Sequence, residues 1–174
     1  MIINIENFYN TQNLYEVVKD LQFKENTYGE EIVDFNLVPE NLHKVFGEIL
    51  NQEITITKES GILRKPFENI HFESFNQNSL WVCIIPLEKT TFKLHRHKEK
   101  NYSNVMQVQE ELQVFIKENC FNKENWNDSA TFELNEGDLI LMKPWMWHSI
   151  SKNLVKVFYL ESQPKVQVEK NENI

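Results

Sequence analysis

Two short segments of the sequence carry side chains that could hold a metal ion together. One contains His71 and Glu73, separated by a single residue, and the other ends at His148. Two imidazoles and one carboxylate are the ligands of mononuclear Fe(II) sites that keep coordination positions open for O₂ and a co-substrate. The sequence therefore predicts an iron site formed by these three residues, although they lie far apart along the chain.

The local sequence around each candidate ligand is typical of a β-strand end. Residues i and i+2 of a strand project from the same face, so His71 and Glu73 would point together. His148 follows the apolar run Leu139–Met142, and Pro144 between them would end that strand because proline has no N–H to donate. Strand ends of this kind converge at the mouth of a β-barrel, where ligands from different strands can meet.

The hydrophobic pattern predicts a mostly β fold with flanking helices. Apolar residues recur at helical spacing over 14–21, 42–50 and 105–116. Because the strands do not alternate regularly with helices, an antiparallel sandwich or barrel is favoured over a parallel sheet. The predicted strands are Glu53–Thr57, Asn69–Phe72, Leu80–Leu87, Thr91–His95, Ala130–Leu134, Asp138–Met142 and Leu154–Leu160.

Composition limits the classes of protein to which the chain can belong. Its 174 residues are 41% hydrophobic and 25% charged, which is typical of a soluble globular domain. The formal net charge of −8 argues against a nucleic-acid partner, since such a surface needs clustered lysines and arginines. No apolar run approaches the roughly 18 residues of a membrane span, so no membrane partner is expected.

The organisation along the chain predicts a single domain over residues 1–174. Residues 1–52 are expected to be a helical part that packs on a barrel of about residues 53–168. The opening residues lack the basic start and long apolar stretch of a signal peptide. Cys83 and Cys120 are expected to be reduced thiols, which is consistent with a cytoplasmic protein.

The segment around His148 resembles a motif of a known family. Gly137-Asp138, an apolar strand, Pro144 and Trp147-His148 are similar to the seventh strand of the Jumonji-C (cupin-like) 2-oxoglutarate oxygenases. The resemblance extends over about residues 68–161. It implies a double-stranded β-helix, which is the cupin or jelly-roll barrel.

A second stretch is similar to the first motif of that family. His71-x-Glu73 is followed by an apolar strand and then by Lys89, which leads into a strand containing an aromatic residue. The resemblance implies that His71, Glu73 and His148 hold Fe(II), and that Lys89 pairs with the distal carboxylate of 2-oxoglutarate. Lys93 is the alternative cation.

The activity implied by the resemblance is an Fe(II)- and 2-oxoglutarate-dependent dioxygenase. Such an enzyme would use O₂ to hydroxylate or demethylate a small molecule or a protein side chain, with release of succinate and CO₂. The hard chemistry would belong to the iron and the co-substrate, so no side-chain acid or base is expected.

Three other interpretations are open from the sequence. The phytanoyl-CoA-type oxygenases are similar but place the co-substrate cation on the last strand, where this chain has Lys156. The pair His95-x-His97 together with His148 resembles the ligand set of a simple metal-binding cupin with isomerase or other chemistry. The third interpretation is a non-catalytic β-barrel that binds a partner.

Overall fold

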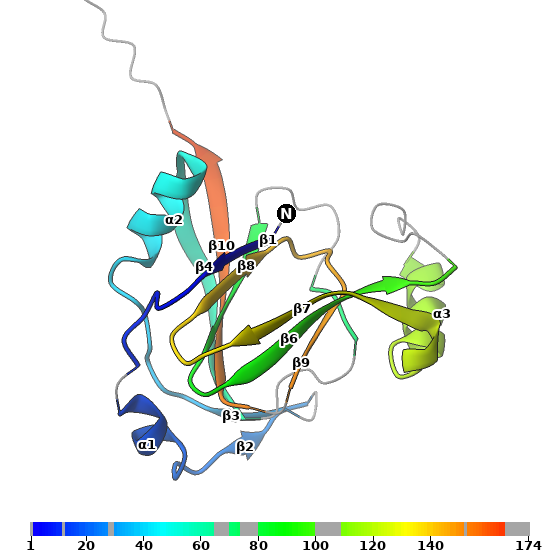
Figure 1. Cartoon of the computed structure of the whole chain (residues 1–174), viewed down its shortest axis with the longest axis horizontal. Helices are drawn as coiled ribbons and strands as arrows, with labels where there is room; N and C mark the ends of the chain where they lie inside the picture. Colours follow the sequence, from blue (N-terminus) through cyan, green and yellow to red (C-terminus); the bar gives the residue numbers. More distant parts are fainter. Residues whose placement is uncertain are drawn as a thin grey trace, which may run out of the picture.

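A computed structural model describes residues 2–11, 13–27, 30–64, 70–73, 80–99, 109–151 and 153–165. Within these ranges the chain forms two antiparallel sheets that face each other (Figure 1). The larger sheet has the strand order β1-β8-β5-β10-β4-β3-β2, and the smaller has the order β7-β6-β9. The strands are β1 Ile2–Ile5, β2 Lys24–Glu25, β3 Glu31–Val33, β4 Gln52–Leu63, β5 Leu80–Pro86, β6 Thr90–His97, β7 Trp126–Leu134, β8 Leu139–Met142, β9 His148–Ile150 and β10 Val155–Pro164.

The main core lies between the two sheets and follows from the two-residue period of the strands. Val82 and Ile84 of β5 point inward, whereas Trp81, Cys83 and Ile85 point to the opposite face of the sheet. The other strands alternate in the same way, so the apolar inner faces of the two sheets are buried against each other. The inward set is Leu63, Val82, Ile84, Phe92, Leu94, Leu134, Ile140, Met142, Ile150, Val155 and Val157.

Two helices cover apolar surface that the sheets leave open. Helix α2 (Leu42–Leu50) lies beside β4 and β10 and packs Leu42 and Phe46 against the outer face of the larger sheet (Figure 1). Helix α3 (Gln109–Asn119) contributes Phe115 to a smaller cluster with Trp126 and Trp147. That cluster includes Ile70 and Trp147, the chain neighbours of His71 and His148.

The predicted helices match the structure in position but not in every boundary. Helix α2 spans the predicted 42–50, while α1 (Leu14–Val18) ends three residues before the predicted limit. The third helix is α3, and the first part of its predicted range, including Val105 and Val108, lies outside the described residues. In the part of the chain that is described, no helix is long and apolar enough to cross a membrane.

Residues 1–52, predicted to be a helical part that packs on the barrel, contain strands β1, β2 and β3 as well as helices α1 and α2. β1 pairs with β8, and β3 pairs with β4, so this segment extends the larger sheet at both edges. The predicted strand Asn69–Phe72 is reduced to one bridge between His71 and His148, with Asn69 outside the described residues. The mostly β, antiparallel fold itself is confirmed.

Candidate metal centre

His148 is fixed by its strand and by the ring beside it. It begins β9, is paired with Leu94 of β6, and its side chain is 1% exposed. The ring stacks on Phe92 with centroids 5.6 Å apart, and Nδ1 lies 2.9 Å from the carbonyl oxygen of Met146. A carbonyl at Nδ1 holds the proton there, which leaves Nε2 as the nitrogen with a free lone pair.

Backbone hydrogen bonds bring His71 and Glu73 to the same place. The amide of His71 donates to the carbonyl of His148 at 3.0 Å, and the amide of His148 donates back at 2.8 Å. The amide of Glu73 donates to the carbonyl of Pro144 at 2.7 Å. The two sequence motifs are therefore joined by main-chain contacts, and these contacts set the positions of the side chains.

The three side chains converge on a common point. Nε2 of His71 lies 3.4 Å from Oε1 of Glu73, and Nε2 of His148 lies 3.6 Å from the same oxygen. One nitrogen or oxygen from each residue lies within 4.8 Å of the others. Among the described residues, no other group of three His, Cys, Asp or Glu side chains meets this condition. The donor set and spacing fit one divalent metal ion with one side left open.

The charges of the site are those that a metal needs. Burial, and then the nearby His71, lower the pKa of His148 to about 3, although the charge of Glu73 opposes them. Burial by itself would raise the pKa of Glu73, but hydrogen bonding to His71 and the charge of His148 outweigh it and lower that pKa to about 2. At neutral pH the site therefore holds a neutral His148 imidazole and an ionised carboxylate, which is ready to bind a cation.

Tyr159 is a further residue of the site, and the motifs did not point to it. Its hydroxyl donates to Oε2 of Glu73 at 2.9 Å. Burial, and then the charge of Glu73, raise the pKa of Tyr159 well above its usual value, so the hydroxyl keeps its proton and remains a donor. The alternation of Val155, Val157 and Tyr159 in β10 was the available signal, because it places all three on the inner face.

Lys58 and Glu30 bring opposite charges to the same side of the larger sheet. Lys58 pairs across the strands with Tyr159, and its Nζ lies 5.5 Å from the centre of that ring. Glu30 is a buried carboxylate that accepts from Nδ2 of Asn26 at 3.2 Å. Burial raises the pKa of Glu30; the charge of Glu73 adds to this, and His71 and Lys58 oppose it.

The three lysines predicted to hold the co-substrate lie elsewhere. Lys89 is exposed in the turn between β5 and β6. Lys93 lies on the outer face of β6 and forms an ion pair with Asp128 at 2.9 Å. Lys156 is buried on the face of β10 opposite Tyr159, where it donates to the carbonyls of Ser60 and Phe35. The geometry therefore supports none of them as a partner of the triad.

The alternative ligand set of His95, His97 and His148 is not brought together. Nε2 of His95 contacts Oγ of Ser149 at 2.7 Å on the outer face of the smaller sheet. Nε2 of His97 lies 2.9 Å from Oδ1 of Asn119, beside α3. The histidines of this set point to separate surroundings, so the simple cupin interpretation on these residues was wrong.

Solved structures with a similar fold include one that binds 2-oxoglutarate and one that depends on it. HygX from Streptomyces hygroscopicus with nickel and 2-oxoglutarate bound aligns with a TM-score of 0.56 and 9% identity, covering 92% of this chain and 82% of HygX. The non-heme α-ketoglutarate-dependent epimerase SnoN from nogalamycin biosynthesis aligns with a TM-score of 0.52 and 10% identity, covering 92% and 78%.

These likenesses establish the class of fold, which is the cupin or jelly-roll barrel. No protein-family model and no curated protein sequence matches the chain. The fold is therefore shared with enzymes that use 2-oxoglutarate, while the chemistry of this chain has to be argued from its own residues.

Proposed function

We propose that the protein is an Fe(II)- and 2-oxoglutarate-dependent oxygenase acting on a small molecule or a protein side chain. The observation that carries the proposal is the convergence of His71, Glu73 and His148 within 4.8 Å in a cupin-like barrel. The fold is also that of HygX, which binds 2-oxoglutarate and nickel. We propose that residues 1–174 form one domain, with a barrel over about 53–168 whose larger sheet is extended by strands of residues 1–52.

Bound iron and 2-oxoglutarate would supply an oxidation of the substrate that is driven by loss of CO₂ and formation of succinate. The protein side chains have three tasks in that chemistry. His71, Glu73 and His148 would hold the metal, and a set of three protein ligands would leave coordination positions for the co-substrate and O₂. Phe92 stacks on His148 and excludes water from its ring, and Tyr159 orients the carboxylate of Glu73.

We further propose that Lys58 takes the role first assigned to Lys89. A dicarboxylate that chelates the metal needs a fixed cation for its second carboxylate. Lys58 lies on the face that carries Tyr159, and the Tyr159 hydroxyl contacts Glu73. The Lys58 ammonium stands on a flexible side chain, so it can reach the second carboxylate of 2-oxoglutarate once the co-substrate binds.

Of the two oxygenase families that the sequence resembles, we favour the Jumonji-C type over the phytanoyl-CoA type. In the latter, Lys156 of β10 would hold the co-substrate. Its ammonium is instead buried against two backbone carbonyls on the opposite face of the strand. Lys89, the cation that the Jumonji-C resemblance implies, is likewise exposed in the turn between β5 and β6. The preference for the Jumonji-C resemblance therefore rests on the Gly137-Asp138…Trp147-His148 segment alone.

The proposal is tested by measuring succinate released from 2-oxoglutarate in the presence of Fe(II) and O₂, even without the substrate. We expect turnover in the wild-type protein and none in Glu73→Ala. Lys58→Ala should weaken 2-oxoglutarate binding by about tenfold or more, because a charge-assisted contact is lost. Lys44→Ala, an exposed lysine of α2, is the matched control. Succinate release that is equal in wild type and Glu73→Ala would refute the proposal.

A further inference from the structure

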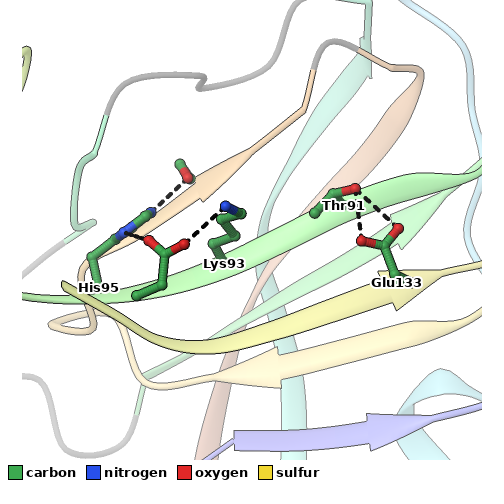
Figure 2. A network of polar contacts seen from close by, with 6 residues as sticks. Thr91, Lys93, His95 and Glu133 are labelled. Atoms are coloured by element: carbon green, nitrogen blue, oxygen red, sulfur yellow. Dashed lines mark hydrogen bonds and ion pairs between the residues drawn. The ribbon is translucent and has the colours of Figure 1, made fainter. Parts of the chain in front are cut away.

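The outer face of the smaller sheet carries a second group of reactive side chains. Thr91, Lys93 and His95 alternate along β6 and point away from the core, whereas Phe92 and Leu94 between them point inward. Figure 2 shows this outer face, with His95 and Lys93 reaching the same carboxylate. None of these three residues belongs to the metal centre.

His95 lies between a hydroxyl and a carboxylate. Its Nε2 is 2.7 Å from Oγ of Ser149, and its Nδ1 is 3.2 Å from Oδ1 of Asp128. Oδ2 of Asp128 accepts from Nζ of Lys93 at 2.9 Å, which holds the carboxylate in place (Figure 2). A hydroxyl, an imidazole and a carboxylate in this order form the arrangement that activates serine nucleophiles.

The burial of the imidazole suits it to act as a base. The His95 side chain is 6% exposed, whereas the Asp128 side chain beside it is 50% exposed. Its Nδ1 is buried, and the 3.2 Å approach to Asp128 is not yet aligned as a hydrogen bond. Catalytic hydrogen bonds are often loose without a ligand and align when the substrate binds.

A cavity opens over these residues and makes the serine accessible. It has a volume of about 270 Å³ and is lined by Ser149 and His95 together with Ile70, Trp126 and Lys123. Ile70 and Trp126 offer an apolar wall for a short acyl chain, and Lys123 offers a cation to the negative charge of a reacting carbonyl oxygen. A histidine with a purely structural role would need no cavity beside the hydroxyl that it contacts.

We infer that Ser149, His95 and Asp128 form a second catalytic site that cleaves small carboxylic esters. Oγ of Ser149 attacks the carbonyl carbon of the ester, and its proton passes to Nε2 of His95. The carbonyl–alkoxy bond breaks, the alcohol leaves with that proton, and the acyl group stays on Oγ. Water then attacks the acyl group with His95 as the base, which releases the acid and restores the serine.

The test is reaction of the full-length protein with p-nitrophenyl acetate and with a fluorophosphonate probe, both with EDTA present so that no metal-bound water contributes. We expect a burst of about one p-nitrophenolate per chain and a probe adduct on the peptide that contains Ser149. Ser149→Ala should abolish both. Asp128→Asn should slow the burst by about tenfold or more, because the imidazolium loses its counter-charge.

Ser151→Ala is the matched control, because that serine accepts from the amide of Thr91 and from Nδ2 of Asn153 rather than contacting a histidine. It should react like wild type. The unfolding midpoint of each variant shows whether that variant has folded. Ser149→Cys tests the same activation by a gain of reactivity, because the new thiol should react with iodoacetamide faster than Cys83 or Cys120. An absent burst and adduct in folded wild type, or an adduct that persists in Ser149→Ala, would overturn the inference.

Discussion

At the scale of single residues, the carboxylate of Glu73 connects the two parts of the proposed iron site. Oε1 faces both imidazoles, and Oε2 accepts from the hydroxyl of Tyr159. Each oxygen therefore has its own task, one toward the metal and one toward the protein. A carboxylate held in this way keeps its orientation when a metal binds, which lowers the entropic cost of binding.

The Tyr159–Glu73 contact gives the first prediction. Tyr159→Phe keeps the ring but leaves Oε2 without its donor, so metal affinity should fall by about 10- to 100-fold. Isothermal titration of the apo protein with a divalent metal such as Co(II) measures the change. Tyr15→Phe on α1, remote in sequence from the triad, is the control. Equal affinities in wild type and Tyr159→Phe would show that Tyr159 has no role in the site.

The second prediction concerns the pH dependence of stability in the apo protein. The folded pKa of His148 is lowered from 6.5 to about 3, and that of Glu73 from 4.5 to about 2. Both groups bind protons more weakly when folded, so the unfolded chain gains protons first as the pH falls. Stability should be full above about pH 6.5 and decline by about 1 kcal/mol per pH unit toward pH 5.

Urea unfolding with EDTA at pH 7.5, 6.5 and 5.5 measures this slope. His148→Gln removes the buried imidazole and should flatten the slope between pH 6.5 and 5.5. His43→Gln replaces an exposed histidine and should leave it unchanged. A steep slope that persists in His148→Gln would mean that another group causes the pH dependence.

The sequence pattern predicted that His71, Glu73 and His148 lie together, which they do, but it did not point to Lys58. The two-residue period of a strand is enough to place His71 and Glu73 together. The role proposed for Lys58 depends on its pairing with Tyr159, about 100 residues away, and on irregularities in the β10–β4 register. Lys156 was selected by its spacing from His148 along the sequence. Because Lys156 and Tyr159 are three residues apart in β10, their side chains point to opposite faces of the sheet.

At the scale of elements, the site depends on β9, which the sequence did not predict. The strand has three residues, so its hydrophobic alternation is too short to detect. It is held by pairing with β6 and by the bridge from His71. β1 was missed because its apolar residues were assigned to a helical segment, although they pair residue by residue with β8.

Gly137 provides the third prediction, because it connects the turn before β8 to the N-terminal segment. Its φ of +79° is unfavourable for other residues, and an added Cβ would overlap the carbonyl oxygen of Tyr9. Gly137→Ala should lower the free energy of unfolding by more than about 1 kcal/mol. Urea denaturation measures the loss of unfolding free energy. A Gly137→Ala variant as stable as wild type would contradict the expected backbone strain at this position.

At the scale of the whole molecule, metal binding should stabilise the fold. The triad joins the segment after β4 to β9 of the other sheet, so a metal at this point would link the two sheets. A ligand that binds only the folded state stabilises it by about 2.7 kcal/mol at 100 times its Kd. Thermal unfolding should therefore shift upward with added Co(II) in wild type but not in Glu73→Ala.

The overall architecture was the most predictable level, because alternating strands separated by polar turns define an antiparallel barrel. The likeness to HygX and SnoN then confirms the fold at 9–10% identity. Substrate recognition is not encoded in such regular patterns. The proposed role of Lys58 depends on a pairing of distant strands that places it beside Tyr159.

The most direct test of the central claim is an anaerobic titration with Fe(II) and then with 2-oxoglutarate, followed by absorption spectroscopy. Wild-type protein should bind one Fe(II) per chain and should bind 2-oxoglutarate only after the metal. His148→Ala should lose both, whereas His95→Ala should keep both, because His95 lies on the outer face of the smaller sheet. Wild-type protein that binds no iron, or His148→Ala protein that binds it as tightly, would contradict the proposed site.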